Sequence, residues 1–294
     1  MAMIDLLASS PTALTLCIFV LGLLIGSFLN VVIHRLPKMM EREFREACLM
    51  EFGPELGSAP DAQGDGATAE ARYDLVVPRS SCPQCGHRIT ALENIPLLSW
   101  LVLRGRCRGC GAQIPLRYPI IEGVTGLVSA FVAARYGFSL ETLAVLVFTW
   151  AMVPLIVIDL DHQLLPDAIT MPVLWLGIVF NLFEVFVPLE DSVLGAIFGY
   201  LSLFLIYWTF KLVTGKEGMG FGDFKLLALI GAFAGWQMLP LTILLSSVVG
   251  AVVGVTLIAT GRLERGRPMP FGPYLAAAGW LALVFGEDIM AVYL

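Results

Sequence analysis

Long apolar runs separated by short polar segments constrain this chain more than any other feature of its sequence. A helix that crosses a bilayer needs about 20 consecutive apolar residues, because its backbone must satisfy its own hydrogen bonds in lipid. With 57% of its 294 residues hydrophobic and 14% charged, the chain can supply several such helices. We expect an all-α polytopic membrane protein with about eight transmembrane helices, near residues 12–33, 119–136, 142–158, 169–187, 193–213, 224–238, 240–260 and 271–293.

The distribution of basic residues predicts the orientation of these helices. Eleven of the 18 Lys and Arg residues lie between Arg35 and Arg117. Cytoplasmic loops next to spans carry the excess of Lys and Arg, so this segment should be cytoplasmic and both termini periplasmic. The first run, 12–33, has no basic residue before it and no small-residue cleavage site after it. We therefore expect a retained helix and not a signal peptide.

The composition changes twice within the long polar segment. Residues 39–77 are polar, mixed in charge and partly rich in small residues, which is typical of a variable segment, although its start has the helical spacing of Phe44, Cys48 and Phe52. From Pro78 onward, cysteine, glycine and arginine dominate. The sequence has no cluster of basic residues interspersed with aromatic ones, so we expect no nucleic-acid partner. We divide the chain into a first helix at 1–33, a cytoplasmic loop at 34–118 with a compact module at 78–118, and a helical membrane domain at 119–294.

Four cysteines in that module form two matched C-x-x-C pairs, each followed by glycine. Four thiolates suit tetrahedral Zn²⁺, and a site with four cysteine ligands has no open coordination position. We therefore predict structural zinc in a small zinc-ribbon-like module. Disulfides or a redox dithiol are the alternatives, and a reducing cytoplasm disfavours the disulfides. The predicted ligands are Cys82, Cys85, Cys107 and Cys110.

Two aspartates at the edges of apolar runs are the strongest indication of catalysis. Asp159 and Asp223 fall at the predicted cytoplasmic ends of two spans, where a carboxylate beside hydrocarbon is costly and usually functional. Two carboxyl groups that meet can hydrolyse a peptide bond, one accepting a proton from water and the other donating one. We expect Gly220 and Gly222 to let the backbone adopt positive φ and a substrate approach closely. Taken singly, each aspartate can instead be a helix cap or loop residue, and Asp161 is the alternative to Asp159.

These motifs resemble those of a known family. Gly220-Phe221-Gly222-Asp223 resembles the G-x-G-D signature of intramembrane aspartic proteases, and 158–167 resembles the companion motif of prepilin peptidases. The resemblance covers nearly the whole chain except 39–77. Segments similar to the amino-terminal half of the bacterial family lie at 26–37, 78–82, 94–100, 104–107 and 118–122.

The resemblance implies an aspartic endopeptidase of the bacterial inner membrane. Such an enzyme removes the leaders of type IV prepilins and type II secretion pseudopilins, cutting after a glycine at the cytoplasmic membrane face among membrane lipids. It implies Asp159 and Asp223 as the catalytic pair. It also implies N-methylation of the new amino terminus with S-adenosylmethionine, for which Gly105, Arg106 and Glu122 are candidates.

Three other functions stay open at this point. The enzyme can be a peptidase without methyltransferase activity. A proton-coupled transporter can use paired intramembrane acids as a relay, although relays usually lie near the bilayer midplane. An adaptor that displays a zinc module to a secretion machine would need no aspartate pair.

Overall fold

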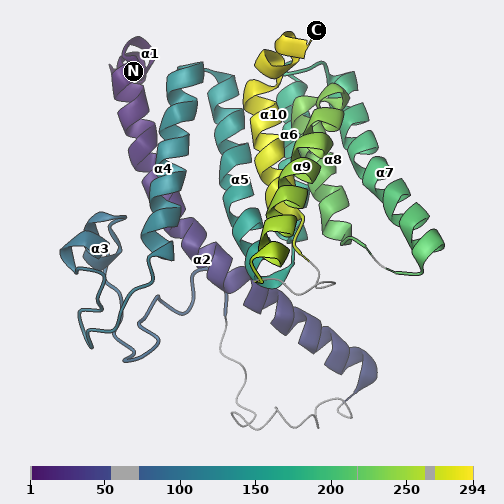
Figure 1. Ribbon diagram of the computed structural model, residues 1–294. Helices are drawn as coiled ribbons and strands as arrows, with labels where there is room; N and C mark the ends of the chain where they lie inside the picture. The colour runs from purple at the N-terminus through teal and green to yellow at the C-terminus, as the bar shows by residue number, and fades with distance from the viewer. Residues whose placement is uncertain (1, 54–72, 217, 262–268, 294) are drawn as a thin grey trace. The chain divides into compact units, whose positions relative to one another are not determined.

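The computed structural model describes residues 2–53, 73–216, 218–261 and 269–293, and these residues are almost entirely helical (Figure 1). The described ranges contain no strand, only two isolated antiparallel bridges, Ser81 with Arg88 and Arg106 with Gln113. The predicted all-α class is therefore confirmed. The elements are α1 (Ala2–Ser9), α2 (Pro11–Phe52), η2 (Leu92–Asn94), α3 (Leu98–Val102), α4 (Arg117–Tyr136), α5 (Leu140–His162), α6 (Asp167–Asn181), α7 (Leu189–Thr214), α8 (Phe221–Ala234), η3 (Trp236–Met238), α9 (Leu239–Ala259) and α10 (Gly272–Tyr293).

Five of these helices are long and apolar enough to cross a membrane: α2, α5, α7, α9 together with η3, and α10. They correspond to five of the eight predicted runs. The helix α4 has 20 residues but does not belong to this group. The helices α6 and α8 have 15 and 14 residues, fewer than the roughly 20 that a full crossing requires. Whether α4, α6 and α8 also cross the membrane, as the count of eight helices requires, stays a prediction.

The chain forms two compact units. The larger comprises Met1–Gly22 and Thr125–Leu294, and the smaller comprises Leu23–Val124. Both α2 and α4 contribute residues to each unit. The segment from residue 39, whose apolar residues have helical spacing, is helical but does not form a separate helix. It is the last part of α2, which continues past Pro37 to Phe52. Residues 54–72 of the predicted variable segment lie outside the described residues.

The short helix α8 forms the centre of the larger unit. Apart from Lys225, every residue from Asp223 to Ala234 is buried, and α6, α7 and α10 pack around the helix. A side chain at Gly195 of α7 would overlap the carbonyl oxygen of Gly231 in α8. Small residues at such contacts let helix backbones approach closely in lipid, where packing replaces the hydrophobic effect as the main force between helices.

Side chains from two neighbouring helices donate hydrogen bonds to the buried backbone carbonyls at the carboxyl-terminal end of α8. Nδ2 of Asn181 donates to the carbonyls of Ala232 and Phe233, at 2.9 and 3.0 Å. Oγ of Ser192 donates to the Ala232 carbonyl at 2.6 Å. The last carbonyls of a helix have no partner within it, and lipid provides none. These bonds therefore allow a 14-residue helix to end inside an apolar bundle.

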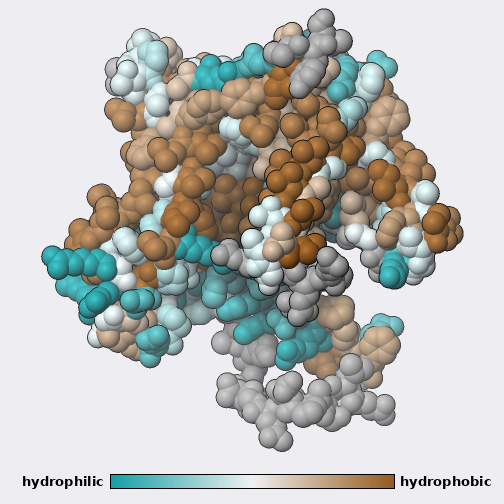
Figure 2. Space-filling model, in the orientation of Figure 1, coloured by the Kyte–Doolittle hydropathy of each residue, from teal (hydrophilic) through white to brown (hydrophobic). Residues whose placement is uncertain are grey.

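The outward surface of the larger unit is apolar. Leu205, Val252 and Val255 are each more than 60% exposed. Figure 2 shows apolar side chains over much of the bundle on the face in view. A soluble protein rarely exposes so much contiguous apolar surface, whereas a membrane protein presents it to lipid. The surface supports the assignment of a multi-pass membrane protein.

In the smaller unit, a buried arginine fastens the cysteine module to α2. Arg35 donates to the carbonyls of Asp74 and Pro78, at 2.8 and 2.6 Å, and its guanidinium lies over the ring of Tyr73. A buried charge is tolerated only when hydrogen bonds replace its water. The segment that leads into the module is thereby held against the helix.

Candidate active site and metal centre

Asp159 lies one turn before the end of α5. The helix begins after Ser139, whose side chain accepts a hydrogen bond from the Thr142 amide. It ends at His162, because Gln163 adopts the left-handed conformation (φ 53°) and donates its N–H to the Asp159 carbonyl at 2.9 Å. The Asp159 side chain is 5% exposed. A helix of almost purely apolar residues thus carries one carboxyl group inside the bundle.

Asp223 is the third residue of α8, and the structure brings its side chain to Asp159. It is 7% exposed, and the two carboxyl groups interact electrostatically. The backbone amide of Gly220 donates to the Asp223 carboxyl group. Asp161, two residues after Asp159, is exposed. Burial and the electrostatic interaction with Asp223 therefore favour Asp159 over the exposed Asp161.

Gly272, at the start of α10, completes the surroundings of Asp159. Its backbone amide faces the Asp159 carboxyl group. A Cβ on Gly272 would lie 2.6 Å from Oδ2 of Asp159, so only glycine fits there without displacement. That Oδ2 is buried and has no hydrogen-bond partner. The sequence reasoning missed this residue, and the available signal was a Gly-Pro pair, Gly272-Pro273, at the beginning of the last apolar run.

The two signature glycines do not have the backbone conformation that the sequence predicted. Gly220 has φ −81°, and Gly222 lies within α8, so the prediction of positive φ is wrong. A Cβ on Gly222 would instead lie 2.8 Å from Cβ of Leu165. Gly222 therefore provides space for Leu165, whose side chain also approaches Gly272. Leu165 thus lies between the two glycines that adjoin the aspartates.

An ion pair joins α6 to α8 beside the aspartates. Nζ of Lys225 lies 2.8 and 2.6 Å from the two carboxyl oxygens of Asp167. Both side chains are partly exposed, so water screens the pair and its contribution to stability is small. It fixes the end of the loop that carries Leu165.

The four predicted metal ligands converge in the smaller unit. Their sulfur atoms all lie within 4.8 Å of one another, and two cross-pairs, Cys82 with Cys110 and Cys85 with Cys107, are each 3.9 Å apart. A disulfide requires about 2.05 Å. A tetrahedron with Zn–S bonds of about 2.3 Å places its sulfurs about 3.8 Å apart. The arrangement fits a four-thiolate metal site and does not fit disulfides.

The two knuckles have matching local geometry. Gly86 and Gly111 have φ of 70° and 73°, and each donates its N–H to the carbonyl of the first cysteine of its pair, at 2.9 Å. Backbone amides of Gln84 and Cys85 lower the pKa of the Cys82 thiol to about 7. Hydrogen bonds to the charged form favour a thiolate, which is the form that binds metal.

Glu93 links the two knuckles. Its carboxylate accepts from the Thr90 amide at 2.9 Å, faces Nε2 of His87 at 3.2 Å and lies 3.7 Å from the Arg108 guanidinium. The Thr90 amide is the main cause that lowers the pKa of Glu93. Polar contacts of Glu93 therefore hold the two knuckles together in addition to the cysteine cluster.

The three methyltransferase candidates have separate surroundings within the smaller unit. Gly105 has φ +68°, and a Cβ there would lie 2.8 Å from the Trp100 ring. Arg106 is exposed and forms the bridge with Gln113. Glu122 accepts a hydrogen bond from the Leu97 amide at 2.9 Å. The contacts of the described residues do not bring these three residues together.

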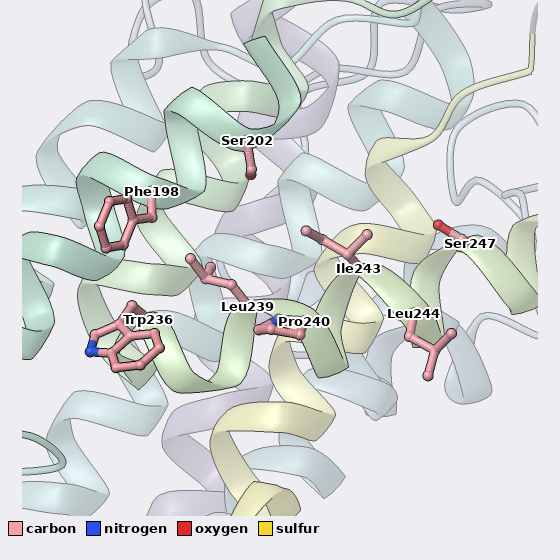
Figure 3. A pocket seen from close by; sticks show the side chains of 8 residues that line it. All are labelled: Phe198, Ser202, Trp236, Leu239, Pro240, Ile243, Leu244 and Ser247. Atoms are coloured by element: carbon pink, nitrogen blue, oxygen red, sulfur yellow. The ribbon is translucent and has the colours of Figure 1, made fainter. Parts of the chain in front are cut away.

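An open apolar groove of about 560 Å³ lies in the larger unit between α7 and the start of α9 (Figure 3). It contains no titratable side chain, and none of its lining residues is a predicted site residue. The groove is therefore separate from the aspartate pair. Its lining residues are Phe198, Ser202, Trp236, Leu239, Pro240, Ile243, Leu244 and Ser247.

Comparison with known proteins identifies the family. Residues 20–136 match the Bacterial Peptidase A24 N-terminal domain, and residues 146–255 match the Type IV leader peptidase family. A prepilin leader peptidase/N-methyltransferase of Stutzerimonas stutzeri is 55% identical over 294 residues, which are 100% of this chain and 98% of the relative. This chain belongs to the type IV leader peptidase family. The predicted resemblance is confirmed.

Other members of the type IV leader peptidase family are similar over comparable lengths. A prepilin leader peptidase/N-methyltransferase of Pseudomonas aeruginosa is 53% identical over 100% of this chain and 98% of the relative. One from Burkholderia pseudomallei is 47% identical over 95% of this chain and 88% of the relative. No solved structure matches the chain. The leader peptidase match contains both aspartates, and the amino-terminal match contains the four cysteines.

Proposed function

We propose that this chain removes the leader peptides of type IV prepilins and type II secretion pseudopilins and then N-methylates the new amino terminus with S-adenosylmethionine. Full-length similarity to proteins named prepilin leader peptidase/N-methyltransferase supports both activities. The observation that carries the peptidase assignment is the buried pair of carboxyl groups on Asp159 and Asp223. An adaptor would have no use for such a pair, and family membership favours a peptidase over a transporter.

Two carboxyl groups that interact electrostatically supply the acid and the base that peptide hydrolysis needs. Like charges this close do not both ionise readily, so one group is ionised and the other protonated. The ionised group takes a proton from a water molecule, whose oxygen attacks the scissile carbonyl carbon, while the protonated group donates to the carbonyl oxygen. As the tetrahedral intermediate collapses, one of its hydroxyl groups returns a proton to the group that acted as the acid, the C–N bond breaks, and the amine leaves with the proton held by the base. The pair then returns to its starting state.

In this proposal Asp159 and Asp223 are the catalytic residues, and Gly220, Gly222 and Gly272 support them. The amides of Gly220 and Gly272 each donate to one of the two carboxyl groups. Rotation of a carboxyl group that is hydrogen-bonded and tightly packed is restricted, so the pair is preorganised for reaction. The cut falls after a glycine of the substrate.

We assign a structural zinc ion to Cys82, Cys85, Cys107 and Cys110. The sulfur separations near 3.9 Å support this assignment. Bound zinc would contribute folding free energy to the module and take no part in the reaction, because four cysteine ligands leave no position for water or substrate.

We place the methyl transfer in the smaller unit, with Gly105, Arg106 and Glu122 as the first residues to replace. S-adenosylmethionine is a second substrate in this proposal. The positive φ of Gly105 and its contact with Trp100 make this residue sensitive to any side chain.

The concentration of Lys and Arg in the smaller unit's part of the sequence supports an inner-membrane location with both termini in the periplasm. The cysteine module and the aspartates then face the cytoplasm, where the prepilin leader lies.

Mass spectrometry of a pilin substrate tests both activities together. The purified protein is incubated with a leader-bearing prepilin and S-adenosylmethionine, and the products are weighed. We expect loss of the leader and gain of one methyl group. Cleavage without methylation would retain the peptidase and refute the methyltransferase, whereas an intact leader would refute the main proposal. Elemental analysis of the same sample tests the zinc assignment.

A further inference from the structure

The helix α3 exposes an apolar face that the smaller unit does not use for its own folding. Leu98, Leu101 and Val102 are 60%, 62% and 80% exposed. Their spacing of i, i+3 and i+4 places them on one side of the helix. The inward residue is Trp100, whose ring packs beside Gly105 and whose Nε1 donates to the Ile114 carbonyl at 3.3 Å. Figure 2 shows apolar side chains gathered where Figure 1 places α3.

Glu122 fixes α3 to a defined level of α4. Its Oε2 accepts from the amide of Leu97, the residue before α3, at 2.9 Å. Leu97 has φ +59°, an uncommon conformation for a residue other than glycine, so it needs such an outside partner. Its side chain also lies in van der Waals range of a Cβ built on Gly123. The start of α3 is therefore held beside the second turn of α4.

That part of α4 is flanked by exposed apolar residues of its own. Ile120 and Val124 are one helical turn apart and therefore lie on one side of α4. The smaller unit therefore carries exposed apolar side chains both on α3 and on the part of α4 that holds the start of α3.

The charges around α3 complement a membrane surface. Arg104 and Arg106 follow α3 within four residues, and both are exposed, whereas Arg108 pairs with Glu93 inside the module. Arginine side chains extend their charged ends toward the headgroup region while their stems cover apolar surface. Clustered basic residues next to a membrane helix attract anionic lipids.

We propose that the cysteine module docks on the bilayer surface through α3. Leu98, Leu101 and Val102 enter the boundary between headgroups and acyl chains, and Arg104 and Arg106 contact anionic phosphate groups. Glu122 is a positioning residue that sets the depth of α3 through Leu97. The inference goes beyond leader cleavage and methylation, and it does not depend on either.

Photo-crosslinking of the full-length protein in lipid nanodiscs tests this proposal. p-Benzoylphenylalanine replaces Val102 in one variant and Arg108, which is similarly exposed, in a control. In nanodiscs of phosphatidylethanolamine and phosphatidylglycerol, mass spectrometry should detect a lipid adduct at position 102 and none at 108. An adduct with a peptide of the larger unit would overturn the proposal, because the patch would then be a protein interface. No adduct, or equal adducts at the two positions, would overturn it as well.

Two further arms test the positioning role and the charge contact. Glu122→Gln keeps an acceptor oxygen for the Leu97 amide and should keep the lipid adduct, whereas Glu122→Ala should lose most of it while its gel-filtration profile stays that of the folded protein. Equal adduct yields in the two variants would refute the role of Glu122. Exchange of phosphatidylglycerol for phosphatidylcholine should lower the yield, and an unchanged yield would refute the contact with anionic lipid.

Discussion

Replacement of Gly272 by alanine should slow leader cleavage without unfolding the protein. The added Cβ would lie 2.6 Å from Oδ2 of Asp159 and 3.2 Å from Cδ1 of Leu165. Ordinary contacts begin near 3.4 Å, so the carboxyl group or the start of α10 must move by about 0.8 Å. A displacement of about 1 Å at a reacting group can cost about 10²-fold in rate. We expect the kcat of Gly272→Ala to fall by roughly that factor, with little change in KM.

The assay follows cleavage of a full-length prepilin in detergent at saturating substrate. Gly250→Ala is the matched control, because Gly250 also lies in the larger unit and its added Cβ would meet Tyr274 at an ordinary 3.4 Å. The two variants should show similar membrane levels and Tm. If Gly272→Ala retains the kcat of Gly250→Ala, the contact between Gly272 and Asp159 does not hold the reacting group, and the reasoning is refuted.

Three further changes test other parts of the structure. Asn181→Leu leaves the buried Phe233 carbonyl at the end of α8 without its donor and the Ala232 carbonyl with Ser192 alone, and should lower the free energy of unfolding by about 3 kcal/mol, measured as a loss of Tm in detergent. Cys107→Ser should remove zinc, measured by elemental analysis, and should reduce methylation more than cleavage, measured as the ratio of unmethylated to methylated product; a fully methylated product would place the methyl transfer elsewhere. Asp167→Asn should change the free energy of unfolding by less than about 1 kcal/mol, because the pair with Lys225 is partly exposed, and a larger loss would show a structural role for this pair.

The sequence predicts those features that depend on local patterns. Apolar runs predict helices because the backbone in lipid has no other way to satisfy its hydrogen bonds. The repeated C-x-x-C-G pattern predicts a converged sulfur cluster, since each knuckle brings two thiols together within one tight turn. Asp159 and Asp223 stand out because a carboxyl group is rare in such apolar surroundings.

Features that depend on contacts between distant segments are not visible in the sequence. Gly272 approaches Asp159 only after α10 has packed against α5, and a single glycine in a glycine-rich chain gives no signal of that contact. In the sequence, Asn181 is an ordinary polar residue at the end of a helix. Its role becomes visible only in the structure, where α8 ends beside it. The helix α8 is shorter than its apolar run because Gly235, with φ +78°, ends it before Trp236.

The role assigned to Glu122 shows the same limit. A family resemblance places this residue in a motif, but the motif does not say what the carboxylate contacts. In the structure its carboxylate accepts from the Leu97 amide, at a left-handed backbone position that no composition or spacing predicts.

The most direct test of the central claim is the single-turnover rate of prepilin cleavage by three variants, Asp159→Asn, Asp223→Asn and Asp161→Asn. Each substitution removes a carboxyl group with almost no change in volume, so a loss of rate reports on acid–base chemistry. The account predicts no measurable cleavage by the first two variants and nearly full cleavage by the third, with all three inserted and equally stable. Full activity of either the Asp159 or the Asp223 variant would contradict it, and loss of activity only with Asp161 and Asp223 would move the pair by two residues.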